Sequence, residues 1–385
     1  MDIDDKNVND TPETETADAE KKPAKQRRLL YDPMFDPKMK EAAVRRGKNT
    51  PMKIIFTVVI LVFIGISLYF SFRSVAQDRY VFTDLDDGTV RLDLFNGQEA
   101  DRVLKIGFKV NEDGSTDASR PVTEIKAYAV TCNEYLRFIR LGKDVKTLDA
   151  RSFFSCKNLM GILVDPENPY FTVIDGVLYQ LEDGVPTRCL LSPAKRGYLL
   201  SSQEAGAPEV LTADDAQAFS DWLDEHQDEA DKAYNGVSED GSDRFTYTVK
   251  LPETVTVIGQ MAFAYAERIS EVEMPDGLTE IEPMGLFRCS DLTGLDLPDS
   301  VVAIGSDAFS YASGIKDIFI PAGVRKIGHH AFFNDGAETV RMELSKDEVK
   351  ELVELGDGWA PKVRKVFKVQ VPIEYSQGRE ASVNG

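Results

Sequence analysis

The sequence predicts a β-rich solenoid, a fold in which short repeated units stack along one axis. Six windows in two groups share one pattern of apolar residues, and within each group their starts are 23 positions apart, at Val122, Val145, Val255, Leu278, Val301 and Val324. A fixed period of this length is typical of solenoids, because each unit leaves an apolar face that only its neighbours can cover. Such folds usually present a long surface, so binding is the first function to consider.

Each unit carries apolar residues at fixed positions, which we expect to form buried columns along the stack. The fourth position holds Ile125, Leu148, Ile258, Ile281, Ile304 and Ile327. The ninth position holds Val130, Phe153, Phe263, Leu286, Phe309 and Phe332. In the last unit Met342 and Leu344 arrive one residue late, which predicts a small insertion there.

A stretch similar to L-x-x-L-x-L-P in each unit predicts a short strand whose alternate residues point inward. Pro275, Pro298 and Pro321 end the strand, because proline cannot donate a hydrogen bond to a continuing ladder. Seven or eight such strands, about 4.8 Å apart, would form a parallel concave sheet roughly 35 Å long. The A-F segment of each unit would then lie on the convex side.

Composition and pattern divide the chain into five segments. We expect a disordered cytoplasmic tail at 1–53, a transmembrane helix at 54–72, a linker with capping hairpins at 73–121, the solenoid at 122–344 with a helical insertion at 203–243, and a C-terminal cap and tail at 345–385. The tail begins with eight acids and one lysine in residues 1–20, a composition that cannot bury enough apolar surface to fold.

Residues 54–72 are 19 residues without a charge, which is enough to cross a bilayer core. Residues 21–53 hold 11 Lys/Arg and three acids, so the positive-inside rule places the N-terminus in the cytoplasm and the repeats outside. The expected location is therefore the cell membrane, with a single span that acts as a signal anchor. The alternative is a signal peptide cleaved after Ala76, for which the leader of 53 residues is unusually long.

The repeats resemble the BspA-like, or treponemal, leucine-rich repeats, whose consensus reads roughly LxxLxLPxxLxxIGxxAFxxC. The resemblance covers most of residues 80–345 and includes YVFTDLDDGTVRLDLFNG at 80–97, which is similar to the capping hairpins of that family. PENPYFTVIDGVLY, followed by CLLSPAKRG, is similar to its irregular hairpin unit. The resemblance implies a leucine-rich-repeat solenoid and a cell-surface protein, often linked to adhesion. The chain departs from the family in the residues between this hairpin unit and the strand at 245–252.

Those intervening residues predict a helix. Thr212 and Asp215 form a pattern typical of a capping box, and apolar residues follow at helical spacing: Ala216, Phe219, Leu223, Ala230 and Tyr234. The helix either lies on the solenoid or protrudes to bind a partner. We expect the scaffold to tolerate its removal, because surface insertions add little closure entropy.

No motif indicates an enzyme or a cofactor. The sequence lacks a P-loop, G-x-G-x-x-G, G-x-S-x-G and H-E-x-x-H, and its three histidines form no metal-binding pattern. The four cysteines are too few for a disulfide scaffold in a chain of this size. Cys132 and Cys156 fall in adjacent units, so a disulfide between them and two buried thiols are both compatible with the repeat.

The concave face is the expected binding surface, through residues that alternate with the buried ones. These residues are Arg137, Phe138, Arg140, Met160, Leu163, Glu271, Glu273, Asp296, Asp317 and Phe319. The face would run from basic and apolar at one end to acidic at the other. Arg137 and Arg140 flank Phe138 and are expected on the same side of the sheet, as a site for an acidic peptide or glycan. The alternatives are that the arginines keep the sheet soluble, while Phe138 packs on Met160 or under the insertion helix.

The function expected from the sequence is recognition or adhesion by a membrane-anchored extracellular solenoid. Its partner would be a protein or glycan outside the cell. Residues 54–385 hold 33 Lys/Arg and 54 Asp/Glu, which argues against a nucleic-acid ligand. The alternative is a structural component of the cell envelope, or a signalling anchor that acts through its cytoplasmic tail. The oligomeric state cannot be predicted from the sequence.

Overall fold

The computed structural model describes residues 79–130, 133–238, 242–266, 268–333, 336–360 and 373–376, all within the compact unit Phe72–Gly385. The expected tail at 1–53 and the expected span at 54–72 lie outside these residues, as does Cys132. Within the six described ranges, no helix combines the length and the apolar character that crossing a bilayer needs.

The first half of the described chain forms two strand ladders. One ladder contains β1 (Tyr80–Asp84), β2 (Val90–Phe95), β5 (Thr116–Ile125) and β7 (Thr147–Leu148), with β4 (Phe108–Val110) paired to β5. The other contains β3 (Val103–Ile106), β6 (Phe138–Leu141) and β8 (Gly161–Val164), all parallel. Each unit thus contributes one short strand to each ladder, because the chain turns sharply between its two apolar segments.

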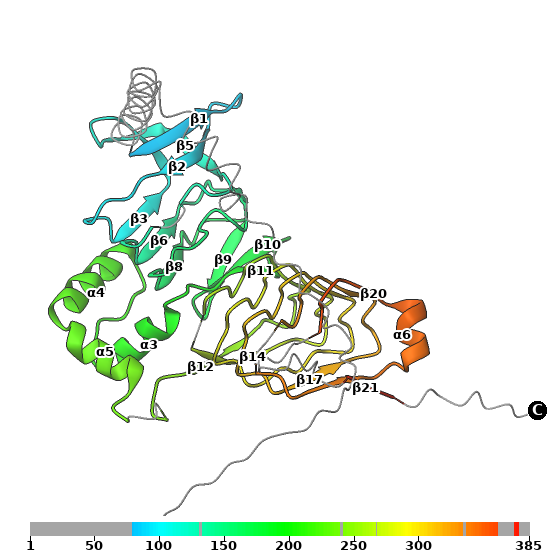
Figure 1. Ribbon diagram of the computed structural model, residues 1–385. Helices are drawn as coiled ribbons and strands as arrows, with labels where there is room; N and C mark the ends of the chain where they lie inside the picture. Colours follow the sequence, from blue (N-terminus) through cyan, green and yellow to red (C-terminus); the bar gives the residue numbers. More distant parts are fainter. Residues whose placement is uncertain are drawn as a thin grey trace, which may run out of the picture. The chain divides into compact units, whose positions relative to one another are not determined.

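A three-stranded hairpin unit links the two groups of repeats (Figure 1). It consists of β9 (Phe171–Ile174), β10 (Val177–Glu182) and β11 (Val185–Leu191), paired antiparallel. Both of its turns are Asp-Gly pairs with positive φ at each residue, the conformation of a type I′ turn. β11 then pairs in parallel with β13 (Val257–Ile258), so the hairpin unit starts the second stack.

The second group again forms two ladders. One continues from β13 through β15 (Glu280–Ile281), β16 (Ala303–Ile304), β18 (Lys326–Ile327) and β20 (Glu354–Leu355). The other contains β12 (Tyr247–Lys250) with β14 (Ile269–Glu273), and then β17 (Asp317–Ile320), β19 (Thr339–Met342) and β21 (Ile373–Tyr375). An isolated bridge joins Glu271 of β14 to Gly294 in the unit between β14 and β17.

The prediction of one continuous concave sheet is therefore wrong. Its strands occur as three separate groups, β3–β6–β8, β12–β14 and β17–β19–β21. The hairpin unit and three helices intervene between β8 and β12. Gly294 lies where the strand between β14 and β17 was expected, and glycine weakens a strand because it has no side chain to pack.

The buried columns follow the predicted register. Ile258, Ile281, Ile304 and Ile327 at the fourth position are at most 1% exposed, and Phe263, Phe309 and Phe332 at the ninth are 0% exposed. Leu148 is the exception and is partly buried. The buried side chains form one cluster in each group of repeats, which confirms that the units bury their apolar faces against their neighbours.

The spacing from β17 to β19 is one residue shorter than between the regular units, so the insertion predicted before Met342 is wrong. Ile318 pairs with Val340 and Ile320 pairs with Met342, which is one position less than the regular spacing. Val340, rather than Met342, occupies the position equivalent to Ile318, and the side chains of Val340 and Ile318 are 0% exposed. Because strand side chains alternate, this register keeps Val340 and Met342 inside the stack.

Three helices follow the hairpin unit, namely α3 (Arg196–Glu204), α4 (Ala213–Glu225) and α5 (Gln227–Asn235). The capping box expected at the start of α4 is present between Thr212 and Asp215. The expected single helix is divided at His226, which ends α4 and precedes α5. A fourth helix, α6 (Lys346–Leu352), starts with a second capping box between Ser345 and Glu348.

Candidate functional site

Helix α4 covers the strand face of β3 and β6 (Figure 1). Phe138 on β6 is 0% exposed and packs edge-to-face against Phe219 of α4, with ring centroids 5.7 Å apart at 80°. Met160 is 6% exposed in the same cluster, and Leu163 packs against it. The expected exposure is wrong for Phe138 and Met160, which are buried under the helices, as the alternative of packing under the helix anticipated; Leu163 is only partly buried.

The two arginines of this region have partners within the molecule. The Arg137 guanidinium donates to the Ser220 carbonyl at 2.8 Å and to Asp224 Oδ1 at 2.5 Å, both on α4. Arg140 pairs with Asp165 at 2.9 Å. Alternation along β6 puts Phe138 and Arg140, rather than the two arginines, on one face. Arg137 precedes the strand and reaches α4 from there, so the two arginines do not form a joint site.

The acidic half of the predicted surface is open. Glu271, Glu273, Asp296 and Asp317 are exposed, and Phe319 is 38% exposed. In the strand register, Glu273 lies beside Lys250, and Asp317 lies beside Thr339. Arg341 lies between its register neighbours Phe319 and Glu374. The exposure of these five residues is as predicted. We use the term acidic face for the exposed residues of β12, β14, β17, β19 and β21 together with Asp296.

The acidic face carries an excess of negative charge. It holds five acids and two cations, which gives −5 + 2 = −3; these residues are Glu271, Glu273, Asp296, Asp317, Glu374, Lys250 and Arg341. Lys250 and Glu273 form an ion pair at 3.6 Å, but both side chains are about half exposed or more, so the pair contributes little stability. No group of three metal-ligating side chains occurs in the part of the chain that the structure describes.

A row of aromatic rings lies along the turns of the second group of repeats. The rings of Tyr265, Phe287, Tyr311 and Phe333 follow one another edge-to-face, with centroids 5.5 to 5.7 Å apart. The Arg288 guanidinium lies 5.1 Å from the Tyr311 ring centre. Sequence analysis missed this row, although the aromatic residues recur at the tenth or eleventh position of each unit. The rings are half-buried against one another, so their first role is packing.

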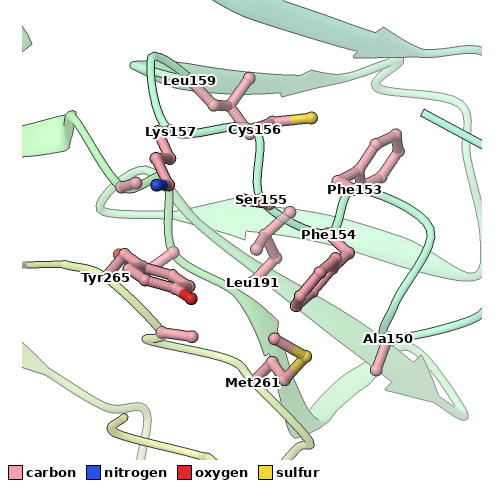
Figure 2. A pocket seen from close by; sticks show the side chains of 13 residues that line it. Ala150, Phe153, Phe154, Ser155, Cys156, Lys157, Leu159, Leu191, Met261 and Tyr265 are labelled. Atoms are coloured by element: carbon pink, nitrogen blue, oxygen red, sulfur yellow. The ribbon is translucent and has the colours of Figure 1, made fainter. Parts of the chain in front are cut away.

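A small gap lies where the first group of repeats meets the second. Figure 2 shows Phe153, Phe154, Leu191, Met261 and Tyr265 among the side chains that line it. The gap holds about 30 Å³, which is about the share of one water molecule in the liquid. It is therefore a packing defect between dissimilar units and too small for a ligand.

Each unit contributes one strand to each of two ladders, and the units stack at a regular spacing around buried columns of Ile and Phe. This arrangement defines a leucine-rich-repeat solenoid. The repeats are similar to those of the BspA type. The model of the "BspA type Leucine rich repeat region" matches residues 111–170 and 242–353, in six copies. This match supports a BspA-like leucine-rich-repeat protein, a class generally involved in protein interaction or surface adhesion.

Solved structures similar to this chain include leucine-rich-repeat proteins. One from Eubacterium ventriosum has 13% identity and a TM-score of 0.40, over 74% of this chain and 83% of its own. A leucine rich cell surface protein from Faecalibacterium prausnitzii has 17% identity and a TM-score of 0.35, over 77% and 75%. The pneumococcal vaccine antigen PcpA has 12% identity and a TM-score of 0.36, over 74% and 97%. No curated protein matches the sequence.

Proposed function

We propose that this chain is a membrane-anchored surface protein that recognises another protein through the acidic face. One observation carries the proposal. The helices bury Phe138 and Met160 on the strand face of the first group of repeats, whereas the predicted residues on the strand face of the second group are exposed. A binding role for Phe138 and Met160 would require the helices to leave, whereas the acidic face is accessible as it stands.

The chemistry of the acidic face favours a partner with a basic surface. Four predicted carboxylates, on Glu271, Glu273, Asp296 and Asp317, are exposed to solvent. Complementary charge accelerates association and excludes like-charged partners. Phe319 lies next to Arg341 in the register and adds an exposed aromatic ring of the kind that often contributes strongly to binding. The proposed partner is therefore a protein segment rich in Lys and Arg.

Capture by the purified full-length protein tests this proposal. We expect the triple variant Glu271→Lys, Glu273→Lys, Asp296→Lys to lose a partner that the wild type retains from envelope or host extracts, and added salt to weaken wild-type capture. The matched control is Glu225→Lys, Asp228→Lys, Glu229→Lys, which makes the same charge change on exposed residues of α4 and α5. Equal loss in both variants would show that net charge, rather than the acidic face, mediates capture.

The orientation in the membrane is a second part of the proposal. The cation excess of residues 21–53 precedes the apolar residues 54–72, which favours a cytoplasmic N-terminus and extracellular repeats. Protease added to intact cells should then digest residues 80–385 and spare the tail. Protection of the repeats would contradict this orientation, and release of a soluble product beginning near Gln77 would show a cleaved signal peptide.

A further inference from the structure

One cleft lies away from the acidic face, between β8, the hairpin unit and α3. It has a volume of about 520 Å³, within the usual range of small-molecule sites. Its walls combine polar and apolar surface, and the apolar part includes Phe138, Met160, Leu163, Leu200 and Val210. The two charged side chains that line it are Asp165 and Arg196.

Asp165 already has partners. Its Oδ2 accepts a hydrogen bond from Arg140 at 2.9 Å, and its Oδ1 accepts one from the Glu167 backbone at 3.1 Å. The acid is thus paired with a cation on the neighbouring strand. Arg196 is the charged group whose donors remain available in the cleft.

Arg196 begins α3 and is largely enclosed by the protein. Its Nε is buried and has no hydrogen-bond partner, and no acid lies within 4.0 Å of the guanidinium, in the residues that the structure describes. The guanidinium packs directly on Gly176, where an added Cβ would collide with Nη1. It also lies 5.8 Å from the ring centre of Tyr247. These contacts hold the charge at the cleft without neutralising it.

The energetics of this arrangement favour an anion. Burial lowers the pKa of Arg196, and the charges of Tyr247, Asp175 and Tyr179 only partly offset the effect. Arginine still remains protonated at neutral pH, so its donors stay unpaired in an apolar setting, at a cost to stability. The hydroxyl of Tyr179, which also feels the charge of Arg196, is buried and unpaired among the described residues as well.

We propose that this cleft binds a small organic carboxylate with an apolar body. The carboxylate pairs with the guanidinium of Arg196, because the planar fork of arginine matches a carboxylate in two hydrogen bonds. The body lies against Leu163, Leu200 and Val210. A free organic acid and the C-terminal residue of a peptide share this chemistry. The site is independent of the acidic face, so either proposal can fail without the other.

Calorimetry and thermal unfolding with the full-length protein test the site. 4-Phenylbutyrate serves as a free acid and N-acetyl-leucine as a peptide C-terminus; 4-phenylbutanol and N-acetyl-leucinamide are their uncharged counterparts. At least one carboxylate should bind about tenfold or more tightly than its uncharged counterpart and raise the unfolding temperature. The carboxylate that binds more tightly shows whether the natural ligand is a free organic acid or the C-terminus of a peptide. Absence of binding by both, or equal binding by the uncharged compounds, overturns the proposal.

Arg196→Gln should retain the fold and lose the stabilisation by carboxylate. The control Arg325→Gln removes a cation from an exposed residue of the second group of repeats and should bind as the wild type does. Val210→Trp fills the cleft without changing Arg196 and should also abolish binding, which keeps the test decisive if Arg196→Gln fails to fold. Unchanged carboxylate binding by Arg196→Gln or by Val210→Trp would show that the ligand binds elsewhere.

Discussion

The ring of Phe138 lies edge-on to the ring of Phe219, 5.7 Å between centroids at 80°, and both side chains are 0% exposed. This contact joins strand β6 to helix α4. It makes the helical insertion a cover for an apolar strand face. Removal of residues 203–243 would uncover Phe138 and Met160, so we no longer expect the scaffold to tolerate it without loss of stability or solubility.

The coupling between these rings can be measured directly. Phe138→Ala and Phe219→Ala should each lower the free energy of unfolding by about 3–5 kcal/mol, because each removes a buried ring. In the double variant the losses should fall short of additivity by about 0.5–1.5 kcal/mol, the usual interaction of an aromatic pair. Chemical denaturation of the four proteins gives the cycle. Full additivity would mean that the two rings stabilise separate parts of the molecule.

Phe309 tests the register of the repeats. Its ring stacks on Phe332 of the next unit, with centroids 5.1 Å apart at 2°, and is 0% exposed. Phe309→Ala should lower the free energy of unfolding by about 3–5 kcal/mol. Amide exchange should increase mainly in the neighbouring units, since stability in a solenoid is local.

Phe319 provides the matched control for this substitution. It belongs to the same unit as Phe309 but is 38% exposed on the acidic face. Phe319→Ala should change the free energy of unfolding by less than about 1 kcal/mol, as expected for a surface position. Equal effects of the two substitutions would contradict the assigned register.

Buried thiols should make the fold less stable at alkaline pH. Burial raises the pKa of Cys189 and Cys289, both of which are 0% exposed. In the unfolded chain the thiols ionise above about pH 8.5, whereas the folded state keeps them protonated. The free energy of unfolding is therefore unaffected by ionisation of the thiols below that pH. Above it, the free energy of unfolding decreases by up to about 1.4 kcal/mol per pH unit for each thiol.

Cys189→Ala separates this effect from other titrations. The variant should show a shallower loss of stability between about pH 8.5 and 10 than the wild type, in urea unfolding under reducing conditions. Cys289→Ala should do the same in a different unit. If both variants follow the wild-type pH profile, thiol burial does not explain the alkaline instability.

The capping box of α4 should contribute measurably to the helical cover. The Thr212 hydroxyl accepts a hydrogen bond from the Asp215 backbone at 3.2 Å, and the Asp215 carboxylate accepts one from the Thr212 backbone at 2.7 Å. Thr212→Ala should lower the free energy of unfolding by about 0.5–2 kcal/mol. Thr212→Ser retains the hydroxyl and should restore most of this loss; a serine variant as unstable as the alanine variant would exclude the cap as the cause.

The backbone of the turns shows what periodicity alone does not reveal. Met261, Met284, Asp307 and His330 occupy the same place in successive units with φ between 52° and 60°, although none of them is glycine. The Met261 and Asp307 amides bond to carbonyls of the following unit, at 3.2 and 2.8 Å. These inter-unit hydrogen bonds offset a conformation that costs non-glycine residues of order 1–3 kcal/mol each. No residue preference in the sequence announces such a turn.

The sequence by itself determined the repeat, its spacing and its buried columns. Apolar residues recur every 23 positions, as Ile281 and Ile304 do. They can be buried only when equivalent residues of adjacent units pack against each other. The exposure of Glu271 and Asp296 followed from the same alternation, because their strand neighbours point into the stack. Even the capping box at Thr212 was local enough to be read from its spacing.

The tertiary structure alone decided which part of the strand face is open. Alternation shows that Phe138 shares a face with Arg140, but what covers that face depends on α4, which is distant in the sequence. The position of Arg196 beside Gly176 also required the hairpin unit and α3 to meet in space. Periodicity assigns a residue such as Phe138 to one face of a strand. Whether that face is buried, and whether a charge such as Arg196 lacks a partner, depends on contacts between segments that are distant in the sequence.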